Sequence, residues 1–67
     1  MHETVIVSHL IQEAMRAIDG CEAQLRVKSI RLEIGRLSCA SPEALLWAFE
    51  ALSAGTRLEG ALLEIEH

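Results

Sequence analysis

Apolar residues in the first third of the chain recur at the spacing of an amphipathic helix. From Glu3 to Asp19 they mark one stripe at the i, i+3, i+4 and i+7 positions, formed by Val7, Leu10, Ile11, Ala14 and Ile18. This spacing is typical of a helix that buries one face. Gly20 follows, and glycine readily adopts the left-handed conformation with which many helices end. We therefore predict a helix over Glu3–Asp19.

The pattern then changes to the alternation of a half-buried strand. Ile30, Leu32 and Ile34 alternate with charged residues, and successive side chains of a strand point to opposite faces of a sheet. This alternation predicts a strand over Leu25–Gly35.

The sequence Ser41-Pro42-Glu43 predicts the start of a second helix. Ser41 can accept a hydrogen bond from an amide of the first turn, and Pro42 suits the first helical position, where an N–H has no helical partner. Glu43 complements the positive end of the helix dipole. We predict that this helix runs to Gly55 with Trp47 partly exposed, off an apolar stripe of Leu45, Ala48, Phe49 and Leu52.

The last run, Ala61–Glu66, alternates again and predicts a second strand. The order of elements is thus helix, strand, helix, strand. The connection from the first strand through the second helix is long enough for a right-handed parallel crossover. We predict an α/β (α+β) fold in which two helices pack on a short open sheet, as a single domain over residues 1–67.

Length and composition narrow the possible functions. A chain of 67 residues buries about 60% of the surface that its unfolded form exposes, so added support from a disulfide, a metal or a partner chain is expected. An apolar content of 51% argues against disorder. A net charge of −4 and two aromatic residues, Trp47 and Phe49, argue against nucleic-acid binding. The chain also lacks a visible acid–base–nucleophile set, so we do not expect an enzyme.

Cys21 and Cys39 form no C-x-x-C pair, which argues against a zinc knuckle or a thioredoxin-like site. The chain start has no basic region, Glu13 interrupts its apolar run, and no segment has the roughly 18 apolar residues of a membrane span. We therefore expect a cytoplasmic protein with reduced thiols.

The richest chemistry lies at the first residues. The α-amine of Met1, the amide and imidazole of His2 and the amide of Glu3 are close in covalent connectivity, so they can surround one metal in fused chelate rings. Ni(II) and Cu(II) favour such tetragonal nitrogen sets, and the Glu3 carboxylate can tune or orient the site. The alternative is an ordinary chain start, because a histidine in second position is a common chance occurrence.

Several short motifs, in this order along the whole chain, resemble the HypA/HybF family of nickel-delivery proteins for [NiFe]-hydrogenase maturation, some of which also serve urease. The motifs are Met1-His2-Glu3, Arg31-Leu32-Glu33-Ile34-Gly35, Ser41-Pro42-Glu43-Ala44-Leu45 with Ala48-Phe49-Glu50, Gly55-Thr56 and Leu63-Glu64-Ile65-Glu66. The resemblance implies that Met1, His2 and Glu3 hold Ni(II). It also implies hydrogenase maturation accessory proteins and the hydrogenase large subunit as partners.

Two departures from the family pattern change what we expect. Family members continue past the position of His67 into a zinc domain and return with another strand to the sheet, so we expect no zinc here and a self-associating homo-oligomer. Its contact is expected at Leu62–Ile65 or Ile30–Ile34, because unpaired strand edges attract other chains. Some relatives also carry an acidic residue where this chain has Ser41, so a supplementary carboxylate ligand is not expected.

Other polar residues are weaker candidates. His9 follows His2 by about two helical turns, but we expect a solvated or partly packed side chain. Cys21 and Cys39 have no histidine placed to activate them, and we expect spectator thiols. The acidic end formed by Glu64, Glu66 and His67, and the basic outer face formed by Arg26, Lys28, Arg31 and Arg36, are expected to be solvated.

Two functions from different classes therefore remain. A nickel-binding metallochaperone module accounts for the amino terminus and for the family pattern. A metal-free interaction or self-association domain, derived from the same family, is the alternative. Nickel titration of a protein with a free Met1 separates them.

Overall fold

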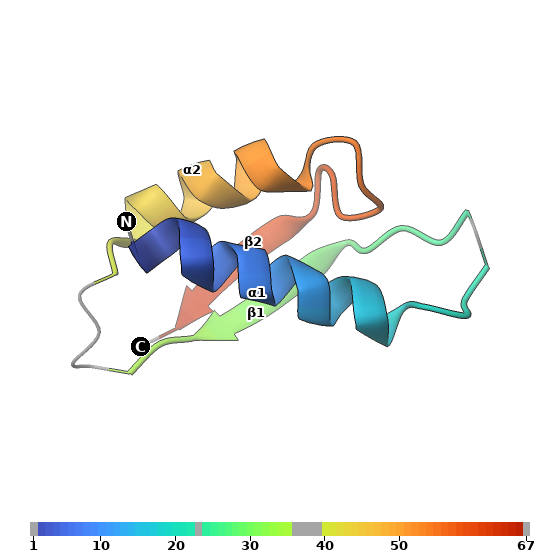
Figure 1. Ribbon diagram of the computed structural model, residues 1–67, viewed down its shortest axis with the longest axis horizontal. Helices are drawn as coiled ribbons and strands as arrows, with labels where there is room; N and C mark the ends of the chain where they lie inside the picture. The colour runs from blue at the N-terminus through green and yellow to red at the C-terminus, as the bar shows by residue number, and fades with distance from the viewer. Residues whose placement is uncertain (1, 23, 36–39, 67) are drawn as a thin grey trace.

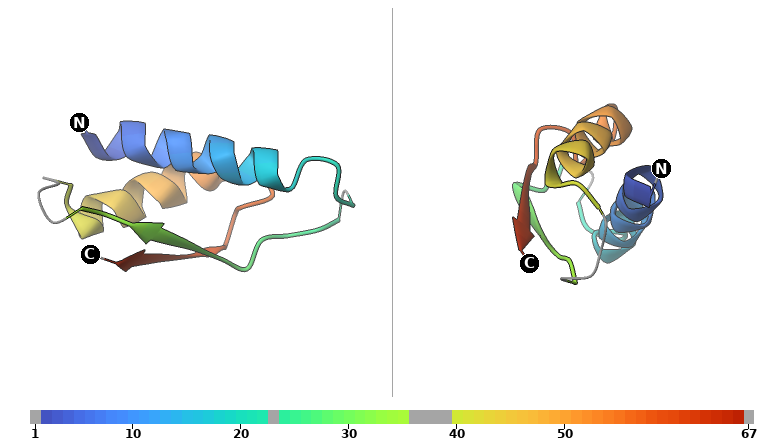
Figure 2. Two further views of the ribbon diagram at one scale, coloured as in Figure 1. Left: turned by 90° about the horizontal axis from the view of Figure 1, so that it is seen from below. Right: turned by 90° about the vertical axis from the view of Figure 1, so that its left-hand side faces the viewer.

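The computed structural model describes residues 2–22, 24–35 and 40–66, with the backbone alone for His2. Its elements are α1 (His2–Ala17), β1 (Ser29–Glu33), α2 (Pro42–Ser53) and β2 (Leu62–Glu66). The predicted order of helix, strand, helix, strand is confirmed. Both helices lie on one face of a two-stranded sheet, so the molecule has a helical layer and a sheet layer (Figures 1 and 2).

Helix α1 ends earlier than predicted. Its last helical residue is Ala17, and residues 18–20 form a hydrogen-bonded turn instead, in which Asp19 N donates to Arg16 O at 3.2 Å. Gly20 has a φ of 90°, the left-handed conformation expected of it. Val7 is fully buried, and the other members of the predicted stripe are half-buried, so the predicted face of α1 is confirmed.

Helix α2 starts as its sequence predicts. Ser41 lies in extended conformation (φ −84°, ψ 126°), and its Oγ accepts a hydrogen bond from Ala44 N at 3.4 Å. The prediction that Leu52 is buried is wrong, because its side chain is 41% exposed. The buried row is Leu45, Phe49 and Ser53, spaced four residues apart, and this row leaves Leu52 at the edge of the buried face.

The two strands pair in parallel, with Ser29 opposite Leu62 and Glu33 opposite Glu66. A parallel pair is what a crossover through α2 requires, and the prediction is confirmed. Strand β1 is shorter than the predicted Leu25–Gly35. In the residues before it, Val27 N donates to the carbonyl of Arg57 in the α2–β2 connection, at 3.4 Å, and not to a strand.

The core lies between the two layers. Its buried members are Val7, Leu45, Phe49, Leu58 and Leu63. In both strands the apolar side chains that face the helices alternate with exposed ones, as predicted. Within the described part of the chain, no helix is long and apolar enough to cross a membrane.

Candidate metal centre

The amino-terminal end of α1 lies beside the beginning of α2. Figure 1 shows the first turn of α1 next to the first turn of α2, and a hydrogen bond joins the two helix starts: Ser41 N donates to Glu3 Oε2 at 3.1 Å. Glu3 is half-buried in the first turn of α1, and Ser41 is the N-cap of α2. Residues 38 positions apart in sequence thus meet at the candidate site.

Of the predicted ligand residues, the structure describes the side chain of Glu3 and the backbone of His2. Met1 and the imidazole of His2 lie outside the described part of the chain. The amide nitrogens of residues 2 and 3 belong to the first turn of α1, where N–H groups do not donate to carbonyls of the same helix. Their use as metal ligands therefore breaks no hydrogen bond within α1.

The other predicted candidates are not brought together. His9 is exposed on α1, and Cys21 is an exposed free thiol in the turn after it, whereas Cys39 and His67 lie outside the described residues. Over residues 2–22, 24–35 and 40–66, no group of three or more His, Cys, Asp or Glu side chains is close enough to hold one ion.

Two arginines, one in β1 and one in the connection before it, make polar contacts. Arg31 Nε lies 3.3 Å from Glu66 Oε1 on the exposed face of the sheet. Arg26 donates from its guanidinium to Thr56 O at 3.3 Å. Arg31 and Glu66, two of the charged residues predicted to be solvated, are therefore paired at the surface, while Arg26 holds two connections together.

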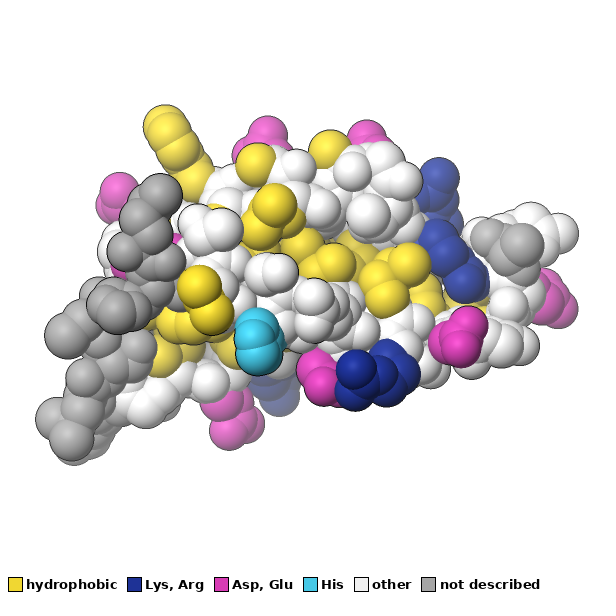
Figure 3. Space-filling view, in the orientation of Figure 1, with side chains coloured by type: hydrophobic (Ala, Val, Ile, Leu, Met, Phe, Trp, Pro, Cys, Tyr) yellow, Lys and Arg dark blue, Asp and Glu magenta, His cyan; other side chains and the backbone are white. Residues whose placement is uncertain are grey.

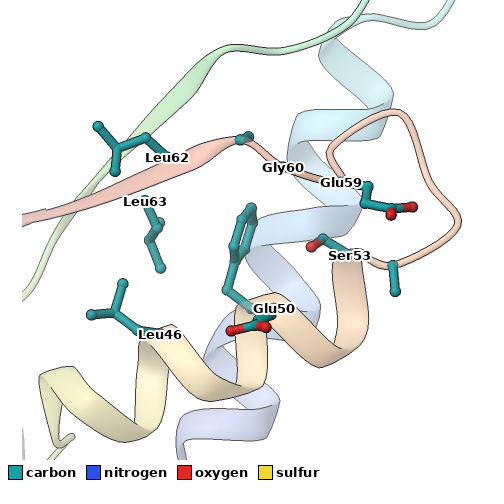
Figure 4. A pocket seen from close by; sticks show the side chains of 10 residues that line it. Leu46, Glu50, Ser53, Glu59, Gly60, Leu62 and Leu63 are labelled. Carbon is teal, nitrogen blue, oxygen red and sulfur yellow. The ribbon is translucent and has the colours of Figure 1, made fainter.

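A groove that the sequence did not reveal lies between α2 and β2. It has a volume of about 580 Å³, and its lining includes Leu46, Phe49 and Leu63. Leu63 points from β2 toward Leu46 of α2, whereas Leu62, at the margin of the groove, points to the other side of the strand (Figure 4). Hydrophobic side chains also reach the surface along the helical layer (Figure 3). Glu59 Oε1 accepts from Gly55 N at 2.8 Å, so one carboxylate at the rim is bonded to the backbone just after α2. The groove offers apolar contact and no set of reactive groups.

Comparison with known proteins identifies relatives over the whole chain. Residues 1–67 match the family described as hydrogenase/urease nickel incorporation, metallochaperone, HypA. The chain is 46% identical over 66 residues to the hydrogenase maturation factor HypA of Roseiflexus sp. (strain RS-1), covering 98% of this chain and 53% of that protein. It is 46% identical over 68 residues to the factor of the same name from Syntrophus aciditrophicus (strain SB), with coverage of 98% and 57%.

A third relative, the hydrogenase maturation factor HypA of Dechloromonas aromatica (strain RCB), is 43% identical over 68 residues, with coverage of 97% of this chain and 57% of that protein. The chain thus spans little more than half the length of these relatives. The family match takes in the amino-terminal residues, both helices and both strands.

Proposed function

Because the chain belongs to the HypA family, we propose that it binds Ni(II) at its amino terminus and delivers it during hydrogenase assembly, with urease assembly as the alternative recipient. The family match over residues 1–67 carries this proposal, since the family is described by nickel incorporation and as a metallochaperone. A carrier of this kind holds and passes on an ion and catalyses no reaction. Its partners would be hydrogenase maturation accessory proteins and the hydrogenase large subunit.

The proposed ligands are the α-amine of Met1, the amide and imidazole of His2, and the amide of Glu3. The chemistry of these groups supports the proposal, because fused chelate rings with nitrogen donors suit the tetragonal preference of Ni(II). The position of His2 and Glu3 supports it too. Both residues lie in the first helical turn, whose amide groups are not engaged within α1.

The test compares the two histidines of α1. In a protein whose mass shows a free Met1, we expect His2→Ala to abolish tight nickel binding in a calorimetric titration. His9→Ala removes an imidazole from an exposed position farther along the same helix and should leave the affinity unchanged. Equal affinities of the His2→Ala variant and the parent would refute the amino-terminal site.

A specific feature of the sheet also favours self-association. Leu62 N donates to Lys28 O and Ile34 N donates to Glu66 O, each at 2.8 Å, so alternate backbone groups of β2 face β1. The backbone groups of Leu63 and Ile65 face the opposite edge, and among the described residues β2 has no second neighbouring strand. Such an edge is a template for another chain.

We therefore propose that the chain forms a homodimer or larger oligomer through this edge, at Leu62–Ile65, or through the edge at Ile30–Ile34. Light scattering at micromolar concentration tests the proposal. A multiple of the chain mass is expected, and a well-folded species of strictly monomeric mass would contradict it. A self-associating chain that does not bind nickel would favour the alternative function, an interaction domain without metal.

A further inference from the structure

The start of α2 contains half of a capping box. In a complete box, the N-cap side chain accepts from the N3 amide, and a Glu or Gln side chain at N3 accepts from the N-cap amide in return. Here Ser41 is the N-cap and its Oγ accepts from Ala44 N. Ala44 occupies N3, however, and its methyl side chain cannot return the bond.

The missing carboxylate comes from α1. Glu3 Oε2 accepts from Ser41 N at 3.1 Å, the bond that an N3 glutamate would make. The carboxylate also lies at the positive end of α2, where negative charge is favourable. The N-cap amide of α2 is therefore bonded to a residue of the candidate metal centre.

From this geometry we propose that Ser41 is a positioning residue of the nickel site. Its backbone N–H holds the Glu3 carboxylate against the start of α2 and thereby fixes the first turn of α1, from which the amide ligands come. This inference rests on the proposed function, and it gives the Glu3 carboxylate the role of an anchor. Ala44 contributes to this arrangement, because a carboxylate at N3 would compete with Glu3 for the N–H of Ser41.

The expected benefit is preorganisation. A ligand set that is ordered before the metal arrives loses less conformational freedom on binding. One charge-assisted hydrogen bond at an exposed position corresponds to roughly a threefold to tenfold change in affinity. A larger effect would mean that the carboxylate itself contacts the metal.

The decisive variant is Ala44→Glu, which completes the capping box within α2. It should release Glu3, weaken Ni(II) binding by roughly threefold to tenfold and change the visible circular dichroism of the bound Ni(II). Its melting temperature should be kept or raised, because the capping box of α2 is then complete. If Ser41 served only the stability of α2, this variant would therefore bind Ni(II) as tightly as the parent. Ala44→Met is the matched control, because it lengthens the side chain without a carboxylate and should leave the affinity unchanged.

A second pair of variants removes the donor itself. Ser41→Pro deletes the N–H at a φ that proline nearly matches, whereas Ser41→Ala deletes the hydroxyl and keeps the N–H. The proline variant should bind Ni(II) more weakly than the alanine variant by a similar factor. The inference would be overturned if the parent binds nickel through His2 but Ala44→Glu matches Ala44→Met and Ser41→Pro matches Ser41→Ala in affinity. The proposed function would then still stand. A parent without tight, His2-dependent binding would overturn both.

Discussion

The two ends of the molecule tie distant segments together in different ways. At the end where the helices begin, the Glu3 carboxylate accepts from Ser41 N. At the other end, where the α1–β1 and α2–β2 connections meet (Figure 1), the donors are guanidinium groups. Arg57 donates to the carbonyls of Leu25, at 3.0 Å, and Glu22, and Arg26 donates to the carbonyl of Thr56.

The difference shows which polar residues are structural. Arg57 is half-buried and donates to backbone carbonyls that accept no hydrogen bond within a helix or strand, so its contacts complete the fold of two irregular connections. Glu3 makes a comparable bond beside the nitrogen atoms that can bind a metal. The two ends should therefore respond separately, with stability governed by the core and the arginine end, and nickel affinity by the amino-terminal end.

The largest expected effect is on the core. Phe49 is 4% exposed, so Phe49→Ala should leave a cavity and cost about 3–5 kcal/mol, enough to unfold a domain with a small reserve of stability. Glu50→Gln, on the exposed side of the same helix, should cost under about 0.5 kcal/mol. Thermal denaturation followed by circular dichroism measures both. Similar melting temperatures would show that the buried face of α2 is misassigned.

The next effect belongs to the amino-terminal end and concerns pH. Binding through the amides of residues 2 and 3 displaces their protons, so protons compete with Ni(II) for the site. Affinity should fall on acidification by at least about a hundredfold per pH unit, the slope set by release of two protons. Titrations in mildly alkaline and mildly acidic buffer measure this slope. A nearly constant affinity would exclude amide ligands, whereas the melting temperature should change little over the same range.

A smaller effect is expected at the arginine end. Arg57→Met keeps much of the aliphatic stem and removes the donors to two carbonyls, which should cost about 1–2 kcal/mol. Lys28→Met removes an exposed charge nearby and should cost under about 0.5 kcal/mol. Urea denaturation of both variants gives the comparison. If Arg57→Met weakens nickel binding in a protein that remains folded, the two ends do not respond separately.

Much of the fold could be predicted because it follows from local patterns of apolar and polar residues. The apolar spacing of α1 and the alternation in both strands follow from which faces are buried, and the cap at Ser41 follows from its own chemistry. Leu58 escaped prediction although it is fully buried. It lies in the irregular α2–β2 connection, where hydrogen bonds such as Leu58 N to Thr56 Oγ1 replace any periodic pattern.

The proposed donor atoms of the candidate site can be named from the sequence, but their surroundings cannot. Covalent connectivity alone suggests a chelate at Met1, His2 and Glu3, and family resemblance selects nickel. The bond between Glu3 and Ser41 depends on how α1 packs against α2, which local spacing does not encode. The one available signal was the incomplete capping box at Ala44, since an N-cap amide without a local acceptor seeks a distant one.

The most direct test of the nickel site leaves every side chain unchanged. Acetylation of the Met1 α-amine removes one proposed ligand and its charge, and His2, Glu3 and Ser41 keep their identities. Adding one residue before Met1 has the same purpose, because it moves the α-amine away from His2. With nickel titrated into the free and the acetylated protein side by side, we expect tight binding to the free form and its loss in the acetylated form. Before metal is added, the acetylated form should have the same or a slightly higher melting temperature, because acetylation removes a positive charge from the start of α1. Equal nickel affinity of the two forms would contradict the amino-terminal site.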